Sequence, residues 1–216
     1  MNASPLLALC IGQPRRFSGE EFSAIDKRPV GGRVTLGRLG LEGDAVADRK
    51  HHGGPEMAVH HYARDHDAMW RSWLGDHPLL DAPAPFGENF ATEGWTEENV
   101  HIGDRFRIGM ALLEVSQPRK PCWKIEHRFG RKGMVAQILT TKACGWYYRV
   151  IEEGHVQEGD CVERVEIGHG EWSVARVFGA LHNPDCKSSQ ANFHSIAKLA
   201  RLSADMRERA LGRLVP

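Results

Sequence analysis

Short runs of β-type residues recur along the chain, and each run is bounded by glycine, aspartate or proline. The runs cover residues 6–11, 33–39, 105–108, 112–116, 146–151 and 161–166. Gly-Asp pairs stand at or just before the start of two runs, at Gly103–Asp104 and Gly159–Asp160. Glycine tolerates positive φ and aspartate bonds nearby backbone, so these pairs are typical of turns and their aspartates are expected to be structural. The pattern predicts a mainly β fold, an antiparallel barrel or sandwich.

Helical spacing replaces the β pattern in two places between these runs. Apolar residues from Val59 to Trp73 repeat at helical intervals, so residues 56–74 are expected to form one amphipathic helix that packs on the barrel and ends at Gly75. A proline-rich loop then leads to Gly87–Asn89. Residues 134–142 carry a second, weaker helical pattern.

The pattern changes again after residue 166, where Gly168 and Gly170 form a hinge. Beyond it, apolar residues around 172–178, 193–200 and 206–211 predict three short helices. We therefore divide the chain into a β-barrel domain, residues 1–168, and a small C-terminal three-helix module, residues 169–216. From Gly170 onward the module carries seven Lys or Arg residues against four Asp or Glu, a mild excess that makes it a candidate docking surface.

Charge and cysteine content exclude several classes of function. The 28 Lys and Arg residues balance the 28 Asp and Glu residues, which leaves no global field to attract nucleic acid or anionic lipid. No apolar run approaches the roughly 20 residues that span a bilayer, and the first residues lack the pattern of a secretory signal. Five cysteines without a CxxC pair are typical of reduced thiols. We expect a cytoplasmic protein that binds neither a nucleic-acid polymer nor a membrane.

The first candidate site is the segment Asp48–Gly54, immediately before the predicted helix. Backbone N–H groups at a helix start attract anions, and glycine lets a phosphate approach closely. We therefore assign a set of cations, an imidazole and glycines to anion binding: Arg49, Lys50, His52, Gly53 and Gly54. The alternative is a polar turn in which glycine serves only tight geometry.

A histidine metal site is a competing interpretation of the same region. His51, His52, His60 and His61, with Asp44 and Asp48, supply metal-binding side chains within a short span. Adjacent residues of a helix point in different directions, however, and no HExxH spacing is present. We therefore prefer the anion site.

Cys122 carries the second candidate site, in the segment Ser116–Lys124. Neighbouring cations favour a thiolate, the form that attacks electrophiles or binds soft metals, and here they are Arg119, Lys120 and Lys124. Most lone cysteines are small buried hydrophobes, the role expected for Cys10, Cys144 and Cys161. A Cys–His hydrolase is the alternative, but no local signature of a thiol protease accompanies Cys122.

A third candidate lies in the strand that begins near Trp146. Alternation places Tyr147 and Arg149 on one face of this strand, so Arg149 can extend into a cavity as an anion clamp. Core aromatic residues with a surface arginine are the equally weighted alternative.

Five motifs follow one another along the chain, namely Gly40–Asp44 (GLEGD), His51–Glu56 (HHGGPE), Phe86–Asn89 (FGEN), Ser116–Cys122 (SQPRKPC) and Gly145–Tyr147 (GWY). Their identity and order resemble MOSC-domain proteins, specifically the bacterial YiiM-like branch. The resemblance implies a MOSC-type β-barrel with packed helices, followed by a three-helix appendage. It also implies a molybdenum–pterin cofactor bound through Cys122, with Arg119, Asn89 and Arg149 among the cofactor-binding residues. Val46 is a departure, because relatives often have glutamine there.

Relatives of this kind include the mitochondrial amidoxime-reducing component, so the resemblance implies reduction of N-hydroxylated compounds, including hydroxylaminopurine-type bases, to amines. No GxGxxG fingerprint or cysteine cluster is present, so the electrons are expected from another protein, a flavoprotein or similar reductase. The competing class is a non-catalytic carrier of the cofactor or of sulfur that uses Cys122. A metal-independent thiol enzyme is the third possibility.

Overall fold

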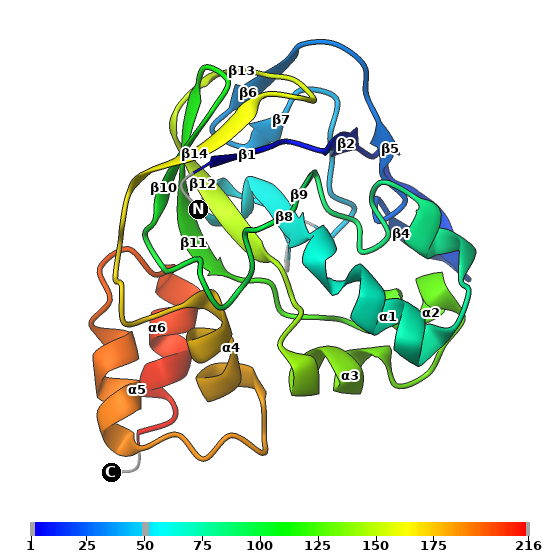
Figure 1. The fold of residues 1–216 in the computed structure, drawn as a ribbon. Coiled ribbons are helices and arrows are strands. Elements are labelled where there is room, and N and C mark those ends of the chain that lie inside the picture. Colours follow the sequence, from blue (N-terminus) through cyan, green and yellow to red (C-terminus); the bar gives the residue numbers. More distant parts are fainter. Residues whose placement is uncertain (1–2, 49–51, 215–216) are drawn as a thin grey trace.

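The computed structural model describes residues 3–48 and 52–214, and its largest feature is a sheet that curves around the core (Figure 1). Within the described residues this sheet has nine strands, in the order β1 (Ala3–Pro5), β14 (Cys161–Glu166), β10 (Arg105–Ile108), β11 (Ala111–Pro118), β12 (Trp146–Glu152), β8 (Val59–Ala63), β9 (Phe90–Thr92), β2 (Ala8–Ile11) and β5 (Arg28–Pro29). Neighbouring strands are antiparallel except β8 and β9, which are parallel. Smaller sheets join β13 (Gly154–Val156), β6 (Val34–Gly37) and β7 (Gly40–Leu41), and the hairpin β3 (Arg15–Ser18) and β4 (Glu21–Ser23). The predicted mainly β fold is confirmed.

The bounds of β10 and β14 match the predicted runs. The turn residues just before each strand explain this agreement. Gly103 and Gly159 have φ angles of 81° and 86°, which side chains rarely adopt. Asp104 Oδ2 accepts a hydrogen bond from the His101 N–H at 3.0 Å, and Asp160 Oδ2 accepts one from the Gln157 N–H at 2.9 Å. The structural role predicted for both aspartates is confirmed.

The helix predicted over residues 56–74 is wrong in its first half. Residues Val59–Ala63 form β8, and only Asp67–Leu74 form a helix, α1. All five residues of β8 are buried, because β12 and β9 flank the strand and both of its faces are covered. A strand buried on both faces lacks polar alternation, so its apolar residues match a helical spacing by coincidence. The end of α1 is as predicted: Gly75 has φ 76°, and its N–H bonds the Arg71 carbonyl at 2.9 Å.

The remaining helices cover the ends of the sheet (Figure 1). Helix α2 (Lys124–Phe129) follows Cys122 directly, and α3 (Met134–Thr141) confirms the second predicted helix. Three more helices, α4 (Val174–His182), α5 (Gln190–Ala197) and α6 (Ala204–Leu211), gather at one end of the molecule as the C-terminal module. Each of them starts at a serine whose Oγ accepts a backbone N–H, which is standard N-capping: Ser173, Ser189 and Ser203.

The C-terminal module shares the core of the sheet. Phe178 of α4 and Met206 of α6 belong to the same buried apolar cluster as Tyr148 of β12. The division of the chain at residue 168 therefore stays a prediction, since packing is continuous across it.

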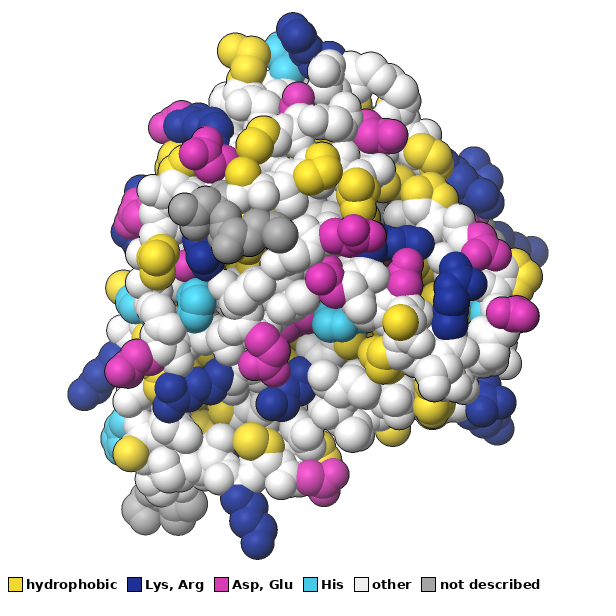
Figure 2. Space-filling model, in the orientation of Figure 1, with side chains coloured by type: hydrophobic (Ala, Val, Ile, Leu, Met, Phe, Trp, Pro, Cys, Tyr) yellow, Lys and Arg dark blue, Asp and Glu magenta, His cyan; other side chains and the backbone are white. Residues whose placement is uncertain are grey.

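Figure 2 shows basic and acidic side chains interspersed over the visible face, in keeping with the balanced composition. Among the described residues, no helix has the length and apolar character needed to cross a membrane.

Candidate functional site

A cavity of about 490 Å³ collects side chains from segments that are far apart in the sequence. Its walls come from residues 23–27, 39–48, 52–58 and 86–89, from His60 on β8, from Tyr147 on β12, and from the segment that follows β11. The volume falls within the roughly 300–1,000 Å³ typical of cofactor and ligand sites.

The structure brings most of the predicted site residues to this cavity: its lining includes His52, Gly53, Gly54, Asn89, Arg119 and Cys122. Arg49 and Lys50 lie outside the described residues. Arg149 does not line the cavity. Its guanidinium instead pairs with Glu56 and Glu114, so the predicted anion clamp is replaced by an internal ion-pair network.

Cys122 is partly buried and lies two residues before the start of α2. Its side chain lines the cavity. All five cysteines fall within the described residues, and Cys122 is the one among them that lines the cavity. Burial of Cys10 and Cys144 is confirmed; it raises the pKa of the Cys10 thiol to about 12 and that of Cys144 well above its ordinary value. The predicted burial of Cys161 is wrong, because its side chain faces solvent from β14.

Arg119 and Tyr147 line the cavity together with Cys122. Arg119 is 7% exposed, and its backbone N–H bonds the Gly145 carbonyl at 3.0 Å. Burial raises the pKa of Tyr147, while the positive charge of Arg119 opposes this shift. The Cys122 side chain also acts on the pKa of Tyr147, so these three groups share one electrostatic environment. A buried cation therefore lines the same cavity as the thiol.

His60 lines the same cavity and is 4% exposed. Its Nε2 has no hydrogen-bond partner among the described residues. Burial, assisted by the charge of Arg119, lowers the pKa of His60 well below 6.5, so the ring is neutral. On the opposite face of β8, His61 bonds Tyr148 and Thr92 and belongs to the core. In the described part of the chain, no three His, Cys, Asp or Glu side chains are grouped to hold a metal ion.

Asp44 and Lys27 form a buried ion pair in the cavity wall that the sequence motifs did not indicate. Lys27 Nζ lies 2.5 and 2.6 Å from the two Asp44 carboxylate oxygens, and the side chains are 8% and 11% exposed. Asp44 also accepts hydrogen bonds from the Gly12 N–H at 2.7 Å and from Asn89 Nδ2 at 2.9 Å. Lys27 belongs to none of the sequence motifs. Of this ion pair, the sequence therefore indicated only Asp44, the last residue of the GLEGD motif.

Asn89 acts as a cross-link between elements. Its Oδ1 accepts the His60 N–H at 3.0 Å, and its Nδ2 donates to the Cys10 carbonyl at 3.0 Å as well as to Asp44. These bonds occupy both amide hydrogens and one of the two acceptor positions of the carbonyl oxygen. Asn89 therefore shapes the cavity wall. Its two amide hydrogens are already used, so the side chain has none left to donate to a cofactor.

Two consecutive glycines form a further part of the wall. Gly53 and Gly54 have φ angles of 80° and 85°, which favour glycine. A Cβ on Gly53 would meet Val46 Cγ2 at 2.9 Å, whereas one on Gly54 would meet open space. They precede a three-residue 3₁₀ turn, Pro55–Met57, so the predicted α-helix start is wrong. Of the predicted anion site, His52, Gly53 and Gly54 line the cavity, whereas Arg49 and Lys50 lie outside the described residues.

Glu88 lies between two cavity-lining residues and is itself 1% exposed. Burial raises the pKa of this carboxyl from 4.5 to about 7, although its Oε2 accepts the Phe86 N–H at 2.9 Å. A carboxyl whose pKa rises on folding contributes stability that is fully present below pH 4.5 and is lost as the pH rises through about 7.

Glu88→Gln keeps an acceptor for the Phe86 N–H and carries no charge. We expect the variant to match the parent at about pH 4 and to exceed its free energy of unfolding by up to about 3 kcal/mol at about pH 8. Urea unfolding of both proteins at the two pH values checks this. A stability difference that does not change with pH would contradict the shifted pKa.

The MOSC domain family matches residues 48–163. Protein YiiM of Escherichia coli is 46% identical over 155 residues, covering 71% of this chain and 69% of that protein. A protein named Reductase from Gibberella moniliformis is 39% identical over 162 residues, covering 74% of this chain but 29% of the fungal protein. The crystal structure of YiiM from Geobacillus stearothermophilus superposes with a TM-score of 0.82 at 30% identity, covering 98% of this chain and all of that one. The chain therefore belongs to the MOSC family, in its YiiM-like branch.

Proposed function

We propose that the cavity binds a molybdenum–pterin cofactor and that the protein reduces N-hydroxylated compounds, such as hydroxylaminopurine-type bases and amidoximes, to the amine. Membership of the MOSC family and similarity to a fungal protein named Reductase support a molybdenum-cofactor oxidoreductase. The observation that carries the proposal is the position of Cys122, whose side chain lines a cavity of cofactor size together with the buried cation of Arg119.

The residues of the cavity fit such a group. A cysteine sulfur is the soft donor that complements a sulfur-rich metal centre. A Cβ on Gly54 would meet open space, so a phosphate can approach the backbone there, whereas the place of a Gly53 Cβ is taken by the Val46 side chain. The unpartnered Nε2 of His60 is a buried polar atom at the cavity wall, and such atoms in native proteins call for a functional explanation.

The overall reaction consumes two electrons and two protons: R–NHOH becomes R–NH₂ and water as the N–O bond breaks. When bound, the molybdenum–pterin supplies the two-electron redox chemistry for this conversion. Cys122 Sγ would hold the metal, and the side chains of Arg119 and Tyr147, which line the same cavity, would face the bound group. The neutral imidazole of His60 adds no charge to the wall, and its Nε2 could form a hydrogen bond with the bound group. The electrons come from a partner reductase.

Production in a host that makes the cofactor, followed by metal and pterin analysis, tests the proposal. We expect near-stoichiometric molybdenum and anaerobic conversion of 6-hydroxylaminopurine to adenine with a chemical reductant. A protein that binds molybdenum but never turns over with excess reductant would be a carrier, and the reductase proposal would be wrong. Turnover without molybdenum would indicate a thiol enzyme instead.

A further inference from the structure

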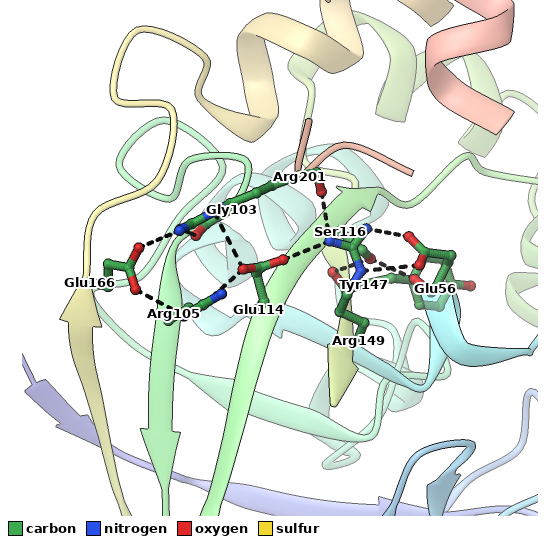
Figure 3. Close-up of polar contacts among 9 residues, drawn as sticks. All are labelled: Glu56, Gly103, Arg105, Glu114, Ser116, Tyr147, Arg149, Glu166 and Arg201. Carbon is green, nitrogen blue, oxygen red and sulfur yellow. Dashed lines mark hydrogen bonds and ion pairs between the residues drawn. The ribbon is translucent and has the colours of Figure 1, made fainter. Parts of the chain in front are cut away.

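Arg149 joins three separate parts of the chain. Its Nε and Nη2 donate to the two carboxylate oxygens of Glu56, the Nε contact being 3.1 Å (Figure 3). Its Nη1 lies 2.6 Å from Glu114 Oε1 and 2.9 Å from the backbone carbonyl of Arg201 (Figure 3). Glu56 belongs to the Pro55–Met57 turn, and Arg201 to the loop between α5 and α6. One guanidinium therefore connects the C-terminal module to the segment beside the cavity.

A second connection runs parallel to the first through Ser116. The Ser116 hydroxyl donates to the Glu56 carbonyl at 2.5 Å and lies 3.0 Å from the Tyr147 carbonyl (Figure 3). The Ser116 carbonyl accepts the N–H of Ser203, the residue that caps α6, at 3.0 Å. The loop between α5 and α6 is thus connected to Glu56 twice: through Arg149 to the Glu56 carboxylate, and through Ser116 to the Glu56 backbone carbonyl.

The Pro55–Met57 turn depends on these connections because it has little packing of its own. None of its residues is buried, and no side chain caps it. Met57 nevertheless lines the cavity, as do Gly53 and Gly54 just before the turn. Apart from the Glu56 contacts, the turn is tied by the Ala58 N–H, which bonds the Tyr148 carbonyl at 3.0 Å.

We propose that Arg149 is a positioning residue, which holds Glu56 to the α5–α6 loop and thereby fixes the glycine wall of the cavity. The C-terminal module is then part of the architecture of the binding site. The consequence for cofactor binding rests on the proposed function above, whereas the positioning itself is a property of the ligand-free protein.

The other ion pairs of this network allow the effect of Arg149 on Glu56 to be measured separately from its effect on Glu114. Glu114 is 4% exposed, yet without Arg149 it retains Arg105 at 2.8 Å and Arg201 at 3.6 Å. Among the described residues, Arg149 is the ion-pair partner of the Glu56 carboxylate. Loss of Arg149 therefore releases the carboxylate of Glu56, whereas Glu114 stays paired. Arg105 is the matched control, because it contacts Glu114 and Glu166 but not Glu56.

Hydrogen exchange of the cofactor-free protein tests the inference. In Arg149→Gln and in Glu56→Gln, the exchange rates of the Met57 and Ala58 amides should each rise about fivefold, the ratio equivalent to about 1 kcal/mol for a partly exposed ion pair. The double variant should add nothing further, because both changes break one interaction. Arg105→Gln should leave these two amides within about twofold of the parent.

Unchanged exchange in Glu56→Gln, which leaves Glu114 fully paired, would overturn the inference. An equal rise in Arg105→Gln would do the same, since it would mean that the network acts only on general stability. Loaded protein gives the second measurement: Arg149→Gln should lose molybdenum on dialysis about tenfold faster than Arg105→Gln, the range seen when groups that orient a metal site are removed. Equal loss would overturn the link to binding. A parent protein that never acquires molybdenum contradicts the proposed function and leaves the exchange result standing.

Discussion

Cys122→Ser is expected to abolish both molybdenum retention and N-hydroxyl reduction. A hydroxyl is a poorer donor to a soft metal than a thiolate, so the substitution removes the ligand while keeping the shape of the side chain. Because changes to groups that only orient a metal ligand cost 10–100-fold, loss of the ligand itself should cost more than about 100-fold in kcat/KM. Steady-state assays with a chemical reductant, together with elemental analysis, measure both effects.

Cys186→Ser is the matched control for this experiment. Cys186 is exposed and does not line the cavity, so its removal should leave metal content and turnover unchanged. Full molybdenum content and full turnover in Cys122→Ser would show that another group binds the metal.

Asp44→Ala is expected to have the largest effect on stability. The change leaves Lys27 buried without its carboxylate partner and removes the acceptor used by the Gly12 N–H and by Asn89. Breaking a buried ion pair from one side typically costs about 3–5 kcal/mol, and we expect a loss of that size in the free energy of unfolding. Lys27→Met should cost less, because Asp44 then keeps two hydrogen-bond donors. Urea denaturation of the three proteins measures the order.

Glu20→Ala provides the control for an ion pair without burial. Glu20 pairs with Arg16 at 2.6 Å, but the two side chains are 93% and 65% exposed. Exposed pairs of this kind contribute between about 0 and 1 kcal/mol, so the variant should unfold almost as the parent does. Comparable losses in Asp44→Ala and Glu20→Ala would mean that burial of the Lys27 pair has no energetic consequence.

Local sequence signals predicted those elements whose ends are determined by turns. Glycines at positive φ bound β10 and β14, and Gly75 ends α1, so the sequence carries these limits directly. The strand β8 could not be recognised in this way, because burial on both faces removes the alternation that marks a strand. Its position depends on pairing with β12 and β9, which is a tertiary property.

The site was predictable to the extent that its residues belong to motifs. Cys122, Arg119 and the two glycines were expected together, and they line one cavity. Lys27 and Asp44 are 17 positions apart and meet only in the folded chain, so no local sequence pattern could predict their ion pair. Arg149 was assigned to the cavity because strand alternation gives the face of a residue but not its partners. The neighbouring Glu56 and Glu114 determine where its guanidinium goes.

X-ray absorption at the molybdenum edge tests the central claim most directly, because it counts the sulfur atoms bound to the metal. The account predicts one more sulfur neighbour in the parent protein than in Cys122→Ser reconstituted with the same cofactor. An identical sulfur count in the two proteins would show that Cys122 does not bind molybdenum, and would contradict the account.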